Sequence, residues 1–386
     1  MEFGPGNPVE TWRIRWPLPV GTYRAVLHRN ANSSPWPVRA TSDIFEVRLS
    51  PEQEAIQAAR RDIVQLINTN QKLAAKFLRL SFHDCVGGCD GCVDLLDAKN
   101  GGLLEPIEAL QPVVAAHAGP GRLLSRADIW ILGAFTGIDV TQGPERIDFS
   151  LRRVGRVNCE DANTVCRNEA GNRVPCGEQR GPFRFLPPND ITTHDLFEFF
   201  DDEFGFTVKQ TVAVMGAHTI GELKRENSGI DGESGWLLNN DIFDNEYYAE
   251  LVGGSSINDP RAVLVDEAPP WRRDIENNND LPQFPNKFVW TGFPEGTKIV
   301  MLNADIAIVR ELTDDNMDEN GVVSCAFVRE GRCPVAERSF QFAAEYTFDN
   351  LMWLIDFAEV MDIMTTKGYA TESGCGIGQV CSLTPI

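Results

Sequence analysis

The sequence predicts a mostly α-helical domain, residues 50–386, that follows a small β appendage, residues 1–49. Two observations predict this fold class. The hydrophobic periodicity changes at Ser50, from alternating strand-like patterns to the three- and four-residue repeats that are typical of helices. The helical segments are joined by long connections rich in Gly, Pro, Asn and Cys, and no alternating β-α-β pattern occurs among them.

The N-terminal appendage contains three segments with strand character, at residues 11–16, 21–29 and 43–49, separated by turn-forming residues. Two or three such strands are marginal in isolation. We therefore expect them to pack on the next domain, to pair with another chain, or to end a longer β-sandwich. They resemble the last strands of an immunoglobulin-like module. Asn32 begins a glycosylation sequon, which is compatible with secretion.

The first helix is marked by its N-terminal residues. Ser50, Pro51 and Gln53 occupy the N-cap, N1 and N3 positions of a capping box, and the helical pattern runs to residue 70. Further helical patterns lie at residues 73–85, 125–138, 191–204, 207–221, 303–315 and 348–364.

The composition is that of an acidic globular protein. The 386 residues include 35 Lys and Arg against 56 Asp and Glu, a net charge of -21, which argues against a nucleic-acid-binding surface. Hydrophobic residues make up 42% and charged residues 24%, which excludes wholesale disorder. No run of roughly 18 apolar residues occurs, so no membrane span is expected.

The ten cysteines fall in close clusters: Cys85, Cys89 and Cys92; Cys159, Cys166 and Cys176; Cys325 and Cys333; Cys375 and Cys381. An even number in close pairs indicates disulfides and an oxidising compartment, so we expect a secreted protein. A zinc site is the alternative, but His83 is the only histidine near a cluster and the spacings fit no common zinc finger. Because the N-terminus lacks a signal-peptide pattern, we expect that Met1 is not the natural start of the precursor.

Two histidine motifs carry the candidate chemistry. In RLSFHDC, Arg79 and His83 are four residues apart, so a helix projects both from the same face into a polar pocket. For this pair alone, a surface helix with a chance arrangement is the simpler interpretation. In VMGAHTIG, His218 ends an apolar helical run between small residues, which let a large flat group approach the backbone. A lone histidine in such a setting is usually a core residue.

In this order, the two motifs resemble those of the haem peroxidases of the plant, fungal and bacterial superfamily. The resemblance covers roughly residues 51–370, through RLSFHDC, LRRVGR, LPPNDITTHDL, VAVMGAHTIGE, FDNEYY and MLNADIAIVRE. It implies a fold of about ten helices that sandwich a b-type haem.

The resemblance assigns a role to each motif residue. It implies that His218 is the proximal iron ligand and that Asp305 accepts a hydrogen bond from its other ring nitrogen. His83 matches the distal acid–base residue, which moves a proton between the oxygens of hydrogen peroxide. Arg79 matches the residue that stabilises the negative charge developing as the O–O bond breaks. Asn100 matches the asparagine that accepts a hydrogen bond from the distal imidazole, at a spacing shorter than usual in the family.

Two positions combine features of different subgroups. The resemblance implies that Phe82 lies against the haem. A phenylalanine precedes the distal histidine in the secreted plant and fungal enzymes, whereas the cytochrome c and ascorbate enzymes carry a tryptophan at this position. Trp236 matches the proximal tryptophan of those intracellular enzymes, seven residues before Phe243. It would share Asp305 with His218 through a hydrogen bond. Packing against the haem and participation in redox chemistry both remain open for Trp236.

Two carboxylates after the first histidine motif resemble the family's distal calcium site. Asp84 and Asp90 match its carboxylate ligands, and backbone oxygens of the turn would add hard ligands. Cys92 replaces a hydroxyl that the family's pattern has there. A solvated acidic turn is the alternative.

A proximal cation site is implied in the same way. Thr219, Asn239 and Asp244 match part of that site, whereas Leu237 stands where the ascorbate enzymes have a threonine. A cation at this place would disfavour a radical cation on Trp236 and leave the oxidising equivalent on the porphyrin.

The sequence thus predicts a secreted haem peroxidase that responds to oxidative stress by reducing hydrogen peroxide, and that oxidises small, aromatic donors by one-electron steps. Asn227 stands where the ascorbate enzymes use an arginine, which argues against that donor site. The alternative is an extracellular structural or assembly protein on the same fold, which pairs through its N-terminal strands. A haem-free helical scaffold is a third hypothesis. The intact motif residues favour catalysis.

Overall fold

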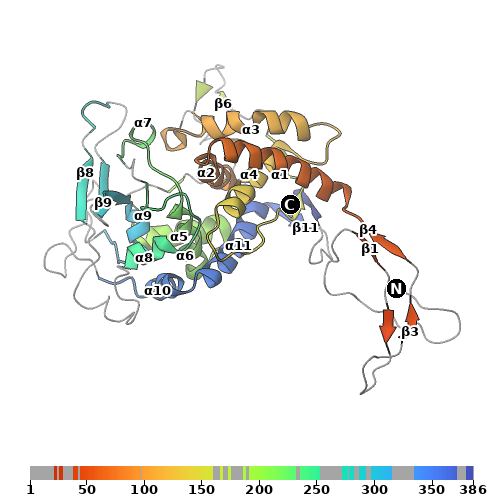
Figure 1. Cartoon of the computed structure of the whole chain (residues 1–386). Coiled ribbons are helices and arrows are strands. Elements are labelled where there is room, and N and C mark those ends of the chain that lie inside the picture. Colours follow the sequence, from red (N-terminus) through yellow and green to blue (C-terminus); the bar gives the residue numbers. More distant parts are fainter. Residues whose placement is uncertain are drawn as a thin grey trace.

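The computed structural model describes the chain in separate stretches. They are residues 21–23, 26–28, 38–41, 44–95, 97–159, 166–167, 173–174, 186–187, 191–231, 235–252, 272–276, 278–281, 287–292, 297–314, 334–371 and 380–385. Eleven α-helices dominate this part of the chain, and its β-strands are short. The mostly α-helical fold class with a small strand appendage is therefore confirmed (Figure 1).

The helices and strands follow the chain in this order. The longer helices are α1 (Pro51–Thr69), α2 (Leu73–Cys85), α3 (Leu104–His117), α4 (Arg126–Thr141), α5 (Thr193–Phe204), α6 (Val208–Met215), α8 (Glu246–Val252), α10 (Phe340–Phe348) and α11 (Asn350–Thr366). The short helical turns are η1 (Ala98–Asn100), η3 (Gly216–Thr219), α7 (Arg225–Ser228) and α9 (Asn303–Ile306). The strands of the helical domain are β5 (Arg153–Val154), β6 (Cys166–Arg167), β7 (Arg173–Val174), β8 (Arg272–Glu276), β9 (Lys287–Gly292), β10 (Ile299–Met301), β11 (Tyr369–Thr371) and β12 (Cys381–Pro385). No helix in the described stretches is long and apolar enough to cross a membrane.

The N-terminal appendage consists of two antiparallel ribbons. The paired strands are β1 (Gly21–Tyr23) with β4 (Phe45–Val47), and β2 (Val26–His28) with β3 (Val38–Thr41). Figure 1 shows them in red, beside the helical domain and ahead of α1. Two of the three predicted strand segments contain strands, whereas residues 11–16 and the sequon at Asn32 lie outside the described residues.

The core of the helical domain is organised around α4. Its residues from Ala127 to Ile138 are all buried, because the helix is almost entirely apolar on every side. Both α1 and α2 pack against it. Gly137 permits the approach of α2, since a Cβ atom at this position would lie 2.9 Å from the carbonyl oxygen of Ala74.

Most predicted helices occur where the periodicity places them. The capping box at the start of α1 is confirmed, because Gln53 N donates to Ser50 Oγ at 3.2 Å and Ser50 N donates to Gln53 Oε1 at 2.8 Å. The pattern at residues 73–85 coincides with α2. The first histidine motif therefore lies on a regular helix, as its four-residue spacing requires.

Two features differ from the prediction. The helix expected at residues 303–315 ends after one turn, as α9, because the following backbone bonds to other segments. Thr193 N donates to the Leu312 carbonyl oxygen, and Glu311 N donates to the Pro334 carbonyl oxygen, each at 2.8 Å. The second feature is an antiparallel sheet in the order β10-β9-β8, which the periodicity does not predict.

Disulfide bonds close the connections around α2. Cys85 is joined to Cys89, and Cys92 is joined to Cys159. Cys381 is disulfide-bonded as well. The side chains of the other five cysteines lie outside the described residues.

Candidate active site

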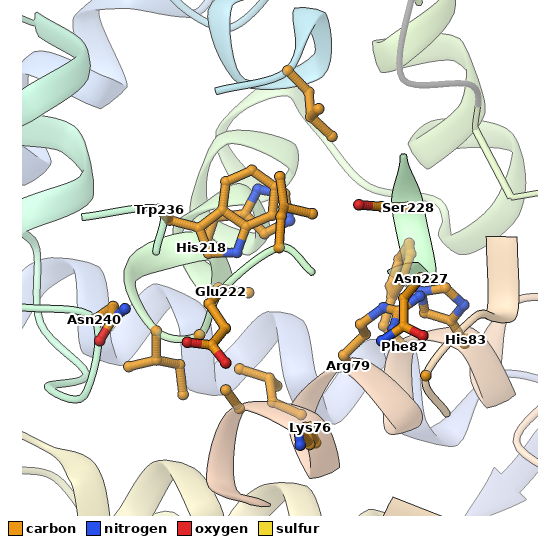
Figure 2. Close-up of a pocket in the computed structure, with 18 of the residues that line it drawn as sticks. Lys76, Arg79, Phe82, His83, His218, Glu222, Asn227, Ser228, Trp236 and Asn240 are labelled. Atoms are coloured by element: carbon orange, nitrogen blue, oxygen red, sulfur yellow. The ribbon is translucent and has the colours of Figure 1, made fainter. Parts of the chain in front are cut away.

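A cavity of about 720 Å³ lies between α2 and η3. Ligand and cofactor sites generally enclose roughly 300–1,000 Å³. Arg79, Phe82 and His83 line the cavity from α2, and His218 lines it from η3 (Figure 2). The two histidine motifs of the sequence therefore face one space.

His83 is held by Asn100. Its Nδ1 lies 2.7 Å from Oδ1 of Asn100, and Nδ2 of Asn100 donates to the carbonyl oxygen of Asp94 at 2.8 Å. Because the amide nitrogen acts as a donor, Oδ1 is the acceptor and Nδ1 of His83 carries the proton. Nε2 of His83 is then the basic nitrogen. The predicted contact with Asn100 is thus confirmed, at a separation of 17 residues.

Arg79 is fixed by the same loop. Its Nη1 and Nη2 donate to the carbonyl oxygens of Gly101 and Lys99, each at 2.8 Å. The side chain is open to the cavity and surrounded by protein elsewhere, and this burial lowers the pKa of Arg79 to about 10. Burial, and next the charge of Arg79, lower the pKa of His83 to about 3. At neutral pH the guanidinium is therefore charged and the imidazole is neutral.

His218 lies on η3, directly after α6. Its Nδ1 lies 2.7 Å from Oδ1 of Asp305, whose side chain is fully buried. Because a carboxylate accepts, Nδ1 donates this hydrogen bond, which leaves Nε2 as the nitrogen available to a metal. Within the described part of the chain, Nε2 makes no hydrogen bond. A histidine ligates a metal in this state, with its second nitrogen held by an acceptor.

Asp305 is also bound by Tyr247 and by the backbone. The Tyr247 hydroxyl donates to Oδ1 at 2.9 Å, and Leu302 N donates to Oδ2 at 2.7 Å. The predicted hydrogen bond from the Trp236 indole to Asp305 is wrong, since none joins these two described residues and Tyr247 bonds to Oδ1 instead. Trp236 stacks on His218, with ring centroids 3.9 Å apart and planes inclined by 7° (Figure 2).

Sequence reasoning missed Tyr247, although the residue belongs to the FDNEYY motif. Its partner Asp305 follows 58 residues later, so no local spacing links the two side chains. The sequence does contain one signal of this role: position 247 is a tyrosine, although a phenylalanine would suffice for packing. Tyr247 is fully buried, so its hydroxyl needs an acceptor.

Small residues flank the proximal histidine for two reasons. Ala217 and Gly221 line the cavity, as expected for the close approach of a flat group. Gly216 faces away from the cavity, where a Cβ atom would lie 2.5 Å from the Tyr248 hydroxyl and 2.7 Å from Nε1 of Trp353. A side chain at Gly216 would displace η3, so this glycine sets the position of the histidine.

α7 packs on the loop after η1 where both segments line the cavity. A Cβ atom at Gly101 would lie 2.5 Å from the carbonyl oxygen of Asn227, and one at Gly102 would lie 2.7 Å from Nδ2 of Asn227. The two glycines therefore let Asn227 pack directly on the loop. This loop holds Arg79 and Asn100, so the contact supports the whole distal side.

The two carboxylates assigned to calcium lie at the end of α2 and in the disulfide-closed turn after it. Asp84 is fully buried, and its Oδ1 accepts from Cys92 N at 2.9 Å. Asp90 is half-buried. The sulfur of Cys92 is bonded to Cys159, so it is neither a hydroxyl nor a thiolate ligand. Carboxylate and backbone oxygens remain as the hard ligands that calcium requires.

The structure brings together two of the three residues predicted for a proximal cation. Thr219 hydrogen-bonds the side chain of Asp244, whose pKa is raised by burial. Asn239 is exposed, and its Nδ2 donates to Oε2 of Glu246 at 3.0 Å. Asn239 is thus directed to a different acceptor.

The residues around the cavity fit a haem. His218 can offer Nε2 as a metal ligand on one side, and His83 and Arg79 provide a base and a fixed cation on the other. The wall between them contains apolar side chains: Leu196, Phe200, Val214, Met215, Leu302, Phe357, Met361 and Met364. Such a wall suits a flat, apolar macrocycle.

Comparison with known proteins agrees with this site. Residues 59–316 match the family model described as Peroxidase. A heme-binding peroxidase of Yarrowia lipolytica is 31% identical over 195 residues, which are 47% of this chain and 57% of that protein. L-ascorbate peroxidase 3 of Arabidopsis thaliana is 30% identical over 236 residues, 57% of this chain and 72% of that protein. Mitochondrial cytochrome c peroxidase of Candida albicans is 30% identical over 191 residues, 46% of this chain and 45% of that protein.

The chain thus spans less than two thirds of the Yarrowia and Candida proteins and more than two thirds of the Arabidopsis protein. The family model, by contrast, covers more than half of this chain and includes both histidine motifs and Asp305. The chain therefore belongs to the peroxidase family.

Proposed function

We propose that this protein is a haem peroxidase that reduces hydrogen peroxide and oxidises small aromatic donors by one-electron steps. One observation carries the proposal: His83 and His218 face the same cavity, and each has Nδ1 engaged by an acceptor, which leaves Nε2 available. One histidine is suited to ligate iron and the other to transfer a proton. Membership of the peroxidase family supports the same activity.

Haem, when bound through Nε2 of His218, supplies the iron that coordinates hydrogen peroxide and takes up its oxidising equivalents. Nε2 of His83 accepts a proton from one peroxide oxygen and donates it to the other, which leaves as water. Transfer of this kind contributes roughly 100- to 10,000-fold in rate. The guanidinium of Arg79 stabilises the negative charge on the departing oxygen.

The remaining polar residues hold these groups in place. Asn100 keeps the proton of His83 on Nδ1, so that Nε2 stays basic. Asp305 accepts a hydrogen bond from Nδ1 of His218, which orients the ring and makes Nε2 a stronger electron donor. Phe82 lines the cavity beside His83 and would take part in holding a haem there.

The residues that line the cavity favour small aromatic donors over ascorbate. Asn227 lies against Gly101 and Gly102, and it is a neutral residue at the position where the ascorbate enzymes use an arginine. This position therefore offers no guanidinium to bind ascorbate. A phenol needs no such cation, because it can transfer an electron from a position near the cavity edge.

We also propose secretion, glycosylation at Asn32 and a distal calcium ion. The disulfides around α2 support an oxidising compartment. Calcium at Asp84 and Asp90 would brace the turn directly after His83. Chelation, carbohydrate analysis and fractionation of the producing cells test these three properties separately.

Absorption spectroscopy tests the proposed activity. The purified protein, supplied with haem, should show a Soret band that changes within seconds of adding one equivalent of hydrogen peroxide. It should then oxidise a small phenol at the expense of further peroxide. A protein that binds no haem, or that binds haem without consuming peroxide, would contradict the proposal.

Assembly through the N-terminal strands is a second candidate function. β1–β4 and β2–β3 are ribbons of only two strands within the described residues, and a ribbon of two strands offers its outer edges to a partner. Light scattering of the full chain tests this candidate. A monomer at all concentrations would contradict self-assembly. The candidate function would then require a different protein as the partner of the N-terminal strands.

A further inference from the structure

We propose that Tyr247, Tyr248 and Tyr346 form an internal redox relay. The relay delivers electrons from the α10–α11 side of the molecule to the proximal pocket, the part of the cavity around His218 and Trp236. The inference rests on the proposed peroxidase function, because peroxide must supply the oxidising equivalents. The relay would let a donor that is too large for the cavity reduce the enzyme from its surface.

The three tyrosines lie in ring contact from the proximal histidine outward. The ring centroids of His218 and Tyr247 are 6.3 Å apart, those of Tyr247 and Tyr248 are 5.1 Å apart, and those of Tyr248 and Tyr346 are 5.1 Å apart. Trp236 is also in ring contact with His218, on which it stacks. Every step is thus a contact between neighbouring rings, the separation at which an electron moves readily.

The composition of this cluster is unusual for the chain. Only five tyrosines occur in 386 residues, and three of them are these neighbours. All three are fully buried, where phenylalanine would fill the same space without needing a hydrogen-bond partner. The chain contains 22 phenylalanines, so an oxidisable ring is used here where the usual choice is one that resists oxidation.

The hydroxyl partners decide where an oxidised tyrosine comes to rest. A tyrosine that loses an electron also releases its hydroxyl proton, so a nearby base stabilises the radical. Tyr248 donates to the carbonyl oxygens of Val212 and Ala213, at 2.8 and 3.1 Å, and a carbonyl cannot keep a proton. Tyr346 donates to Oδ2 of Asp356 at 2.8 Å, and a carboxylate can.

Tyr247 is a poorer resting place than Tyr346. Its acceptor, Asp305, already binds His218 and the backbone of Leu302. Protonating Asp305 would break the support of the proximal histidine. The radical therefore passes through Tyr247 and Tyr248 and settles on Tyr346.

The outer end of the relay reaches solvent. The side chain of Asp356 is 20% exposed and forms an ion pair with Lys209 at 2.7 Å. A proton accepted by Asp356 can therefore exchange with water. Burial, and next the hydrogen bond to Asp356, raise the pKa of Tyr346, so the reduced tyrosine is protonated at neutral pH and has a proton to give.

The relay step balances in electrons and protons. Reduction of one hydrogen peroxide to two waters withdraws two electrons from the enzyme. Tyr346 supplies one of them, which passes through Tyr248 and Tyr247, and its hydroxyl proton moves to Asp356; the bound haem would supply the other electron, and solvent the two protons that the two waters require. A one-electron donor at the surface then returns an electron to Tyr346, which recovers the proton from Asp356.

Electron paramagnetic resonance after rapid freezing tests the relay. One equivalent of peroxide, added without donor to the haem-loaded full chain, should produce a tyrosyl radical signal that narrows when the protein carries ring-deuterated tyrosine. Tyr346→Phe should lose most of this signal. Tyr369→Phe should retain it, because Tyr369 lies outside the cluster and bonds to Val157 N and the Cys89 carbonyl oxygen.

Asp356→Asn provides a second variant that leaves all three rings in place. It removes the proton acceptor of Tyr346, so the tyrosyl signal should fall several-fold while the Soret band remains. If Tyr346→Phe fails to fold, this variant decides the question alone. Comparing the urea unfolding of both variants with that of the wild type identifies a misfolded protein.

Two results would overturn the relay without touching the proposed function. Peroxide could be consumed with no tyrosyl signal, or the signal could persist unchanged in both Tyr346→Phe and Asp356→Asn. Failure of the proposed function looks different, since neither the Soret band nor peroxide consumption would then be observed in the wild type.

Discussion

Replacing Asp305 with asparagine tests how the proximal side of the site is built. The carboxylate is fully buried and accepts three hydrogen bonds, from Nδ1 of His218, the hydroxyl of Tyr247 and the backbone N–H of Leu302. Asparagine has nearly the same shape but carries one oxygen and one NH₂ group. At least one of the three donors therefore faces another donor in the variant.

The expected loss of stability follows from these contacts. A buried donor without an acceptor costs about 1–3 kcal/mol, and each remaining bond loses about 1 kcal/mol when its acceptor becomes neutral. Removing the buried charge relieves part of this loss, because an ionised carboxylate is costly to desolvate. Asp305→Asn should thus lower the free energy of unfolding by about 2–4 kcal/mol. The affinity for haem should fall roughly 10- to 100-fold, as for other residues that support a metal ligand.

Urea unfolding of the haem-free protein and titration with haem measure the two effects separately. Asp356→Asn is the matched control, since it also removes a carboxylate that accepts a tyrosine hydroxyl, whereas only Asp305 bonds to His218. The control should bind haem like the wild type. A haem affinity of Asp305→Asn equal to that of the wild type would refute the support that we assign to Asp305.

Three further predictions concern other parts of the site. Trp236→Phe should leave the peroxide reaction nearly unchanged, because the indole makes no hydrogen bond to Asp305, and stopped-flow absorbance would expose a large fall as a contradiction. A strong calcium chelator should lower activity and thermal stability, and Asp84→Asn should do the same. If activity and thermal stability both stay unchanged after chelation and in the variant, no calcium ion binds at the distal site. The rate of the peroxide reaction should stay level as the pH falls through about 6.5, the ordinary pKa of histidine, since a pKa lowered to about 3 keeps His83 neutral; a half-maximal rate near 6.5 would contradict this.

The helices around the site could be predicted because their signals are local. Arg79 and His83 lie on α2, whose bounds agree with the periodic pattern. The box formed by Ser50 and Gln53 starts α1 as expected. The positions of His218 and Asp305 followed from the family resemblance, and the structure places them 2.7 Å apart.

What could not be predicted depends on contacts between distant segments. The pattern at residues 303–315 is helical in isolation, but backbone hydrogen bonds to Thr193 and Pro334 stop the helix after one turn. The sheet of β8, β9 and β10 is likewise built from pairing between separate strands. Periodicity carries no information about such partners.

The partner of Asp305 is the clearest example within the site itself. The family resemblance suggested Trp236, which stacks on His218, but the hydroxyl of Tyr247 bonds to the carboxylate. Gly216 is a second example. Its small size is required by the close packing of Tyr248 and Trp353, not by the approach of a cofactor. In both cases the type of residue was informative, and only the three-dimensional contacts revealed its use.

The rate of the reaction with hydrogen peroxide in His83→Leu tests the central claim most directly. The matched control is His117→Leu on α3, where the imidazole pairs with Asp62 at 2.7 Å and does not line the cavity. With the Soret band intact in all three proteins, His83→Leu should slow the stopped-flow reaction roughly 100- to 10,000-fold, and His117→Leu should match the wild type. A wild-type rate in His83→Leu would contradict the assignment of this cavity as a peroxidase site.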